Sequence, residues 1–277
     1  MRRISLDPVA QTLDIDGAGC NCSIGPQALL SVYYRAPTYL RDTYQPRLTP
    51  DEQFSRSQWA AFVRSLVSLK VTTWMNHPQA TYLAEMKPYQ LGLASRIGFR
   101  VPHTLVTNSP THAQAIGRNG TVVIKTLDAG VLKVGSREAF IYTNAIPLEE
   151  LKDDDMRSAP AIVQTELEPK LDIRVTVVDG AVLAVEINRD GQAVKGDWRL
   201  QKSGLTFAPH HLPSGIEGLC SRLVRELGLA FGAIDLALHN GEYFFLEINP
   251  TGEWGWLQDA AGLDIDSPLV AALTRGD

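Results

Sequence analysis

Short apolar runs, in which hydrophobic and polar residues often alternate, recur along most of this chain and are separated by turn residues. Such runs are typical of β-strands that bury one face. They predict strands at residues 31–34, 104–107, 121–126, 161–166, 172–178, 181–188, 231–238 and 244–249. Because Asp179-Gly180 and Asn240-Gly241 are hairpin signals, several of these strands are expected to pair with their neighbours in sequence. Such hairpins favour an α+β fold over a doubly wound parallel sheet.

Helical segments lie between these strands and carry their own start and stop signals. The predicted helices cover residues 50–69, 76–85, 88–98 and 214–227, and one more begins near residue 109. Thr49 is expected to cap the first helix and Asn76 the second, because their side chains can accept from free N–H groups at a helix start. Gly98 is expected to end the third. The segment 128–140 is predicted to be a loop that becomes ordered when it closes over a ligand.

Composition and charge narrow the class of protein. The chain has 277 residues and a formal net charge of −5, which argues against a non-specific nucleic-acid binder. No apolar run is long enough for a membrane span, and the first residues lack the apolar core of a signal peptide. Its three cysteines have no disulfide or zinc spacing, so we interpret them as reduced thiols. We therefore expect a cytoplasmic protein that binds neither nucleic acid nor membrane.

The last predicted hairpin places oxygen-bearing side chains in apolar strands. Asp235 lies in one strand, and Glu247 and Asn249 lie in the next. A buried ionised carboxylate costs several kcal/mol unless an opposite charge neutralises it. Magnesium, which prefers oxygen ligands, would supply that charge. The alternative is an edge strand whose acidic side chains face solvent.

The length of the hairpin loop decides whether these three side chains share a face. A two-residue loop would pair Asp235 with Leu246 and send Glu247 to the opposite face. A three-residue loop over residues 239–241, with a bulge at its glycine, would pair Asp235 with Phe245 and bring all three side chains together. A metal site therefore predicts the three-residue loop.

Two lysines are candidates for binding an anion. Lys125 lies in an otherwise apolar strand, which predicts a phosphate partner, although a lysine that extends from a strand end to solvent is the alternative. Lys87 precedes Pro88, where the N-terminus of a helix favours anions. Taken alone, Lys87 is more typical of a solvated side chain.

The segment 164–170 and the strand after it offer further polar groups. An extended linker with a carboxylate and an apolar residue could bind a purine and a ribose, but a surface acidic loop is the alternative. Asp172 and Arg174 share one strand face, either as a surface ion pair or with Arg174 presented to a phosphate or carboxylate. Arg199 is a second candidate for contact with a phosphoryl group or an acidic substrate.

Taken together, these motifs resemble the ATP-grasp fold and, within it, the graspetide synthetases, which are microviridin-type maturases of ribosomal peptides. The resemblance extends from about residue 33 to residue 273. The strongest match is Phe245-Leu246-Glu247-Ile248-Asn249-Pro250-Thr251-Gly252-Glu253-Trp254. The other matching motifs are Ala84-Glu85-Met86-Lys87, Gly98-Phe99-Arg100-Val101-Pro102, Val123-Ile124-Lys125-Thr126-Leu127, Asp172-Ile173-Arg174-Val175 and Asp197-Trp198-Arg199.

This resemblance implies two α+β subdomains that clamp ATP. The ATP-grasp domain would cover residues 76–277, after a partial and shortened N-terminal domain at residues 1–75. The implied nucleotide-binding residues are Lys87, Lys125, Gln164, Glu166, Leu167 and Asp172. Arg174 and Arg199 would face the γ-phosphate and an acyl phosphate. The implied ligands of two magnesium ions are Asp235, Glu247 and Asn249. Met86 departs from the family, whose members often have Asn there.

The implied activity is ATP-dependent phosphorylation of Asp or Glu side chains in a ribosomal precursor peptide. Attack by Thr, Ser or Lys would then close an ω-ester or ω-amide ring. The implied partner is a precursor peptide with a leader and an acidic, Thr-rich core, and a homodimer is a further hypothesis. Two alternatives remain open: a carboxylate–amine ligase for a small molecule or a protein end, and a catalytically silent nucleotide-binding regulatory protein.

Overall fold

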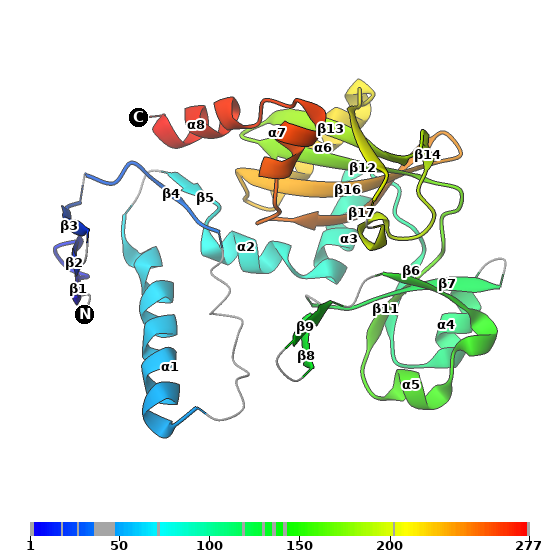
Figure 1. Ribbon diagram of the computed structural model, residues 1–277, viewed down its shortest axis with the longest axis horizontal. Coiled ribbons are helices and arrows are strands. Elements are labelled where there is room, and N and C mark those ends of the chain that lie inside the picture. Colours follow the sequence, from blue (N-terminus) through cyan, green and yellow to red (C-terminus); the bar gives the residue numbers. More distant parts are fainter. Residues whose placement is uncertain are drawn as a thin grey trace.

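The computed structural model describes residues 3–17, 19–26, 28–35, 48–70, 73–117, 120–128, 131–134, 137–140, 143–201 and 203–275. Two larger sheets dominate it, one above the other in Figure 1. All strand pairs in both sheets are antiparallel, and hairpins of consecutive strands occur in the larger one, so the α+β prediction is confirmed. No helix in the part of the chain that these ranges cover is long and apolar enough to cross a membrane.

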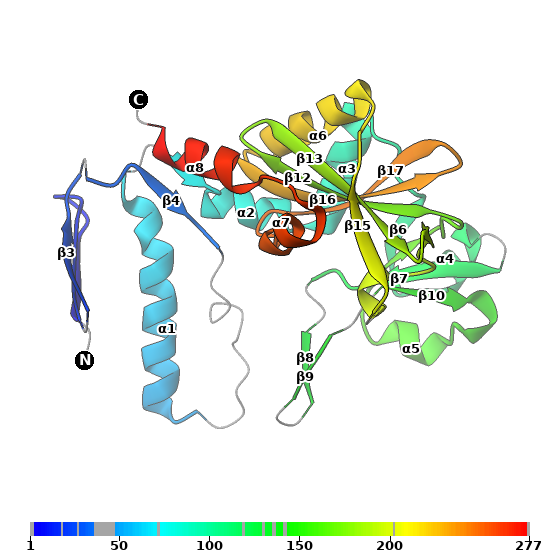
Figure 2. The same ribbon diagram turned by 45° about the horizontal axis from the view of Figure 1, so that its top comes forward.

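The N-terminal segments lie beside this body. The strands β1 (Arg3–Asp7), β2 (Thr12–Gly17) and β3 (Cys20–Ile24) form an antiparallel sheet. A parallel pair, β4 (Ser31–Tyr33) and β5 (Thr73–Met75), leads toward the larger sheets. The helix α1 (Pro50–Ser65) lies between β4 and β5 in the sequence. It has no buried residue and lies apart from the rest in Figure 2.

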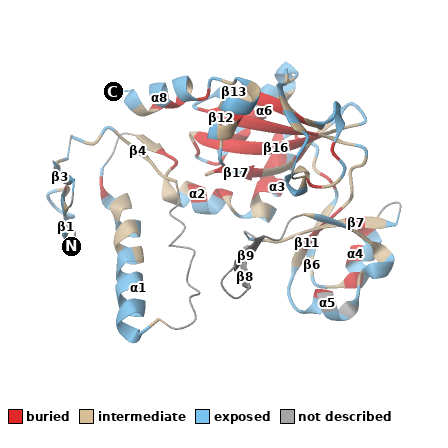
Figure 3. Ribbon diagram, in the orientation of Figure 1, coloured by how far each residue is buried: buried red, intermediate tan, exposed pale blue. Residues whose placement is uncertain are grey.

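The largest sheet has the strand order β14-β13-β12-β16-β17. Its strands are β12 (Leu171–Val178), β13 (Ala181–Arg189), β14 (Gln192–Ala193), β16 (Phe231–His239) and β17 (Glu242–Asn249), and β15 (Leu205–Pro209) also pairs with β13. The central strands β12 and β16 are almost entirely buried, as Figure 3 shows. β17 is at the edge of this sheet.

One face of this sheet is covered by helices. α3 (Lys87–Ile97) and α6 (Ser214–Glu226) contribute Ala94, Leu223 and Val224 to a core that includes Ile173 and Ile234 of the sheet. Because side chains alternate along a strand, Arg174 and Asp235 point to the opposite face. α7 (Gly255–Ala261) and α8 (Asp266–Thr274) pack with buried side chains at one end of that face. The other end is open for a site.

The second sheet has the order β10-β7-β11-β6. Its strands are β6 (Thr104–Thr107), β7 (Thr121–Lys125), β10 (Asn144–Pro147) and β11 (Ala161–Gln164). α4 (Pro110–Ile116) and α5 (Asp153–Arg157) accompany it. A separate hairpin, β8 (Val131–Val134) with β9 (Arg137–Phe140), lies in the predicted loop 128–140. Residues 129, 130, 135 and 136 of that loop are outside the described residues, so its expected ordering stays a prediction.

Most predicted helix ends are found, with one correction. Thr49 and Glu52 form the two hydrogen bonds of a capping box at α1, and Gly98 ends α3 with a φ of 114°. The prediction for Asn76 is wrong, because His77 caps α2 (Pro78–Ala84). The Asn76 side chain is buried and binds distant backbone groups instead.

Candidate nucleotide and metal site

The β16–β17 hairpin brings Asp235, Glu247 and Asn249 to one face, as predicted, but its loop does not have the predicted length. The predicted three-residue loop is wrong: His239 pairs with Glu242, and Asn240 and Gly241 form a two-residue loop, both with positive φ. The pairing then shifts by one residue within the strands. Asp235 consequently lies opposite Glu247.

The shift is a β-bulge at Leu246. Leu236 pairs with Phe245 and Asp235 pairs with Glu247, so Leu246 is the extra residue. This bulge puts Asp235 and Glu247 on one face, and Asn249, two residues further on, shares it. The signal in the sequence is the run Phe244-Phe245-Leu246, three apolar residues that interrupt strand alternation.

Two guanidinium groups hold the carboxylate of Asp235. Arg174, its cross-strand neighbour on β12, donates from Nη1 to Oδ1 over 2.8 Å. Arg199 donates from Nη2 to Oδ2 over 2.6 Å, and the same nitrogen lies 3.7 Å from Glu247 Oε1. Burial alone would raise the pKa of Asp235, but these two arginines outweigh it and hold the pKa well below its usual range. Asp235 is therefore ionised at neutral pH.

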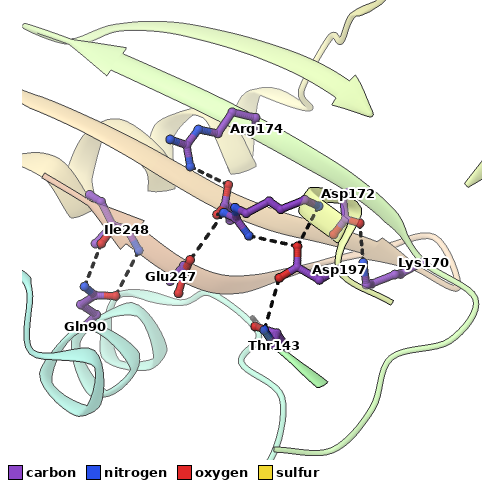
Figure 4. A network of polar contacts seen from close by, with 10 residues as sticks. Gln90, Thr143, Lys170, Asp172, Arg174, Asp197, Glu247 and Ile248 are labelled. Atoms are coloured by element: carbon purple, nitrogen blue, oxygen red, sulfur yellow. Dashed lines mark hydrogen bonds and ion pairs between the residues drawn. The ribbon is translucent and has the colours of Figure 1, made fainter. Parts of the chain in front are cut away.

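The two arginines differ in exposure and in their access to the site. The Arg174 side chain is 8% exposed, whereas that of Arg199 is 34% exposed. Arg199 lies in the 3₁₀-helix Trp198–Leu200, and Asp197 caps that turn by accepting from the Arg199 N–H over 3.0 Å. The Arg199 guanidinium also lies over the Trp198 ring, 4.9 Å from its centroid. Figure 4 shows this network around Asp197 and Glu247.

The donor set suits magnesium in its chemistry. Asp235, Glu247 and Asn249 offer oxygen atoms on one face of two paired strands, and at least Asp235 carries its charge. The Asn249 Oδ1 accepts from the Thr251 N–H over 3.0 Å. Since both Asp235 oxygens already accept from arginines, a cation bound there would compete with Arg199, the more exposed of the two.

A cavity opens beside this network, with about 470 Å³ of space free of atoms. Its charged lining side chains are Lys125, Lys170, Asp172, Asp197, Arg199, Asp235 and Glu247. Arg174 does not line it, so its predicted contact with phosphate stays a prediction. The cavity lies between the two sheets, because Lys125 comes from β7 and the acidic residues come mainly from the larger sheet.

A second cavity of similar size adjoins the first and contains the predicted hinge. Its lining includes Val123, Gln164, Glu166, Leu167 and Leu246, the last of which lines both cavities. Gln164 donates to Thr104 Oγ1 over 2.8 Å, and Glu166 accepts from the Thr121 hydroxyl. An apolar wall with backbone and carboxylate groups at its rim is what a purine nucleoside requires.

The two lysines predicted to bind phosphate are close enough to repel each other, but of the two only Lys125 lines the cavities. Lys125 lines both cavities. Burial lowers its pKa, the Glu247 carboxylate opposes that effect, and Lys87 adds to it as a nearby positive charge. Lys87 donates to the Thr126 carbonyl over 3.1 Å, just after β7. A polyanion at this point would relieve the repulsion between the two lysines.

Lys170 is a site residue that sequence reasoning missed. It forms an ion pair with Asp172 and donates to the Gly196 carbonyl over 3.0 Å, and it lines both cavities. Burial raises the pKa of Asp172 to about 6, although Lys170 opposes that effect. The spacing of Lys170 and Asp172 on one strand face was the available signal; the contact with Gly196 joins segments far apart in sequence.

Comparisons with known proteins were made by sequence and by structure. No family model matches the chain, and no curated protein matches it. The macrocyclase MdnC from Microcystis aeruginosa MRC, solved bound with the precursor peptide MdnA, is 22% identical with a TM-score of 0.79, over 98% of this chain and 85% of that chain. A RiPP-associated ATP-grasp ligase from Chryseobacterium gregarium, solved with ADP and a leader and core peptide, is 24% identical with a TM-score of 0.80, over 98% and 84% of the two chains.

A further similar structure is the ATP-grasp ligase PsnB, solved with a phosphomimetic variant of its minimal precursor, Mg and ADP. It is 22% identical with a TM-score of 0.73 and covers 98% of this chain and 85% of that chain. These similarities show that the chain has the ATP-grasp fold, so the resemblance of its motifs to that fold is confirmed. They give no support to the homodimer hypothesis.

Proposed function

We propose that this protein is an ATP-dependent ligase that closes rings in a ribosomal precursor peptide. It phosphorylates Asp or Glu side chains of the peptide and joins them to Thr or Ser as ω-esters, or to Lys as ω-amides. Residues 76–277 form its ATP-grasp domain, and residues 1–75 belong to an N-terminal domain. The structurally similar ligases that were solved with precursor peptides support a peptide as the substrate.

The observation that carries this proposal is the pair of adjoining cavities that share Lys125, Lys170 and Leu246. The cavity with Glu166 and Leu167 suits the adenosine part of ATP. The cavity with Arg199, Asp235 and Glu247 suits its phosphates. Lys125 lines both cavities, which supports a contact between its ammonium group and the phosphate chain of a nucleotide that spans them.

The reaction divides into two steps. In the first, a peptide carboxylate oxygen attacks the γ-phosphorus of ATP, the bond to the bridging oxygen breaks, and ADP leaves. In the second, the Thr or Ser hydroxyl attacks the carbonyl carbon of the acyl phosphate and loses its proton to solvent. Phosphate departs with one oxygen of the original carboxylate, so each ring consumes one ATP, and the peptide loses the mass of one water without any free water being formed.

The chain supplies charge and position for these steps. Arg199 can donate to the substrate carboxylate and then to the acyl phosphate, since about a third of its side chain is exposed at the cavity and Asp197 accepts from its N–H. Arg174 keeps Asp235 ionised from beneath. Asp235, Glu247 and Asn249 would hold magnesium, which neutralises phosphate charge when bound. No side chain has to form a covalent intermediate.

Thermal unfolding with and without Mg-ATP tests the proposal. A ligand that binds only the native state stabilises it, by about 2.7 kcal/mol at a hundred times its dissociation constant. Mg-ATP should raise the Tm of the wild type, and Glu247→Gln should abolish ATP turnover while the protein stays folded. Glu242→Gln, an exposed site on the same strand, is the matched control. If the wild-type protein is folded and millimolar Mg-ATP does not change its Tm, nucleotide binding is refuted.

A further inference from the structure

The outer edge of β17 is completed at Ile248 by a side chain, whereas at Phe245 the N–H donates to the backbone carbonyl of Arg100 over 2.8 Å. β17 is the last strand of its sheet, so its outward N–H and C=O groups need other partners. The Gln90 amide supplies both at Ile248: its Nε2 donates to the Ile248 carbonyl over 2.8 Å, and its Oε1 accepts from the Ile248 N–H over 3.0 Å. Figure 4 shows this pair of bonds. The amide therefore replaces one residue of a neighbouring strand.

The position of this contact along β17 gives it a functional meaning. Ile248 lies between Glu247 and Asn249, the two magnesium candidates on this strand. Fixing the peptide groups of Ile248 fixes the directions in which both neighbouring side chains leave the strand. Gln90 is itself enclosed, with only 2% of its surface exposed, and its Nε2 also donates to the Ala84 carbonyl.

A second buried amide holds the end of the same segment. The Asn76 Nδ2 donates to the carbonyls of Phe231 and Pro250, each over 2.8 Å. Its Oδ1 accepts from the N–H groups of Ala230 and Phe231. The start of β16 and the residue after Asn249 are therefore joined through one side chain. The two amides therefore hold the segment that carries Glu247 and Asn249 at its middle and directly after its end.

The helix α3 carries both Gln90 and Lys87. Lys87 and Gln90 are three residues apart on α3 and therefore lie on one face of the helix. Lys87 donates to the carbonyl of Thr126, and Gln90 holds Ile248. α3 thus connects the phosphate lysines on one side with the proposed metal ligands on the other.

We propose that Gln90 is a positioning residue for magnesium, acting through the backbone between Glu247 and Asn249. This inference rests on the proposed function, because it assumes that these two residues bind Mg²⁺ with ATP. Groups that orient metal ligands through hydrogen bonds, without touching the metal themselves, commonly contribute 10- to 100-fold to metal affinity. A purely structural role would lower stability and leave the magnesium requirement as it is.

The test measures how the affinity for the non-hydrolysable analogue AMPPNP depends on Mg²⁺ concentration, by calorimetry. Gln90→Met keeps the size of the side chain and removes all of its hydrogen bonds. We expect the Mg²⁺ concentration for half-maximal affinity to rise about tenfold, while affinity in the absence of Mg²⁺ is unchanged. Leu269→Ala, in the core between α8 and the sheet, is the control for lost stability alone and should leave the magnesium requirement unchanged.

Gln90→Glu keeps an acceptor for the Ile248 N–H and tests the inference if the Met variant does not fold. We expect it to give an intermediate increase in the magnesium requirement. If a folded Gln90 variant has the wild-type magnesium requirement, the inference is overturned and the proposed function stands. If wild-type affinity for AMPPNP does not depend on Mg²⁺ at all, the proposed metal site and the inference both fall.

Discussion

Arg199 is the more exposed of the two arginines that bind Asp235. It contacts Asp197, Asp235 and Glu247, yet about a third of its side chain is exposed. Arg174, in contrast, is enclosed and lies against Gly252. The proposed function requires that Arg199 leave these acidic residues and donate to the substrate once magnesium and phosphate are bound.

Replacing Arg199 by Lys should therefore separate nucleotide binding from ring formation. Lysine keeps the charge and loses the planar pair of donors. We expect ATP affinity close to that of the wild type and a loss of about 10- to 100-fold in cyclised product, the equivalent of one charge-assisted hydrogen bond of about 1.5–3 kcal/mol. Both are measured on one preparation, with Arg222→Lys on α6 as the exposed control. Equal losses of binding and product would assign Arg199 to ATP.

Gly252 leaves no room for a side chain beside Arg174. A Cβ at this position would lie 2.5 Å from the Cβ of Ala233 and 2.8 Å from Arg174 Nη2. Gly252→Ala should destabilise the protein by about 1–3 kcal/mol, as other overpacked sites do. Gly255→Ala is the matched control, because nothing lies within 4 Å of its Cβ position. Urea unfolding curves with equal midpoints for the two variants would contradict this packing.

Asp172 gives stability an unusual dependence on pH. Burial raises its pKa from 3.8 to about 6, so the folded state binds its proton more tightly than the unfolded state. Its contribution to stability is complete below about pH 4 and is lost as the pH rises through about 6. Relative to Asp172→Asn, which cannot titrate, the wild type should lose up to about 3 kcal/mol between pH 4 and 7.

The measurement is urea unfolding of both proteins at several pH values. Only the difference between the two counts, because other carboxyl groups, Asp235 among them, titrate in the opposite sense and cancel. A difference that grows in favour of the wild type as the pH rises would contradict the burial of an ionisable Asp172.

At the scale of elements, the bulge in β17 does two things at once. It restores the shared face of Asp235 and Glu247, and it places Leu246 where it lines both cavities. Leu246→Ala should weaken ATP binding by about tenfold, since a leucine side chain that covers a ligand contributes roughly 1–2 kcal/mol by burial. Calorimetric titration checks this, with the exposed Leu30→Ala as control. Unchanged affinity would remove Leu246 from the nucleotide site.

The elements that the sequence predicts well are those specified locally. The Asp179-Gly180 and Asn240-Gly241 turns, the Thr49 cap and the Gly98 stop all depend on residues within a few positions. The predicted loop length of the last hairpin failed because its register changes inside the strand, at an apolar run, and not at the turn.

Contacts that join distant parts of the chain were beyond pattern reasoning. Asn76 is a residue type that often caps helices, but the two carbonyls to which its side chain donates, those of Phe231 and Pro250, are 155 and 174 residues away. The same holds for Gln90 and Ile248, which are 158 residues apart. A side chain that replaces strand pairing leaves no local pattern, so tertiary coordinates are required to find it.

At the scale of the whole molecule, the site exists only where the two sheets meet. Lys125 comes from the smaller sheet, Asp235 and Glu247 come from the larger one, and the segment from Gln164 to Lys170 connects the two. Substrate and nucleotide can then be held from opposite sides, which lowers the entropic cost of bringing carboxylate and γ-phosphate together.

The account is tested most directly by mass spectrometry of a candidate precursor peptide. A small reading frame beside the gene for this chain, with acidic and Thr-rich blocks, would supply it, made with heavy oxygen in its side-chain carboxylates. Incubation with Mg-ATP and the wild-type protein should remove one water per ring and transfer one heavy oxygen atom per ring to inorganic phosphate. Glu247→Gln should give neither. Rings that form without heavy oxygen in phosphate would contradict acyl-phosphate chemistry, and ATP-dependent addition of an amine to the peptide in place of ring closure would contradict the macrocyclase.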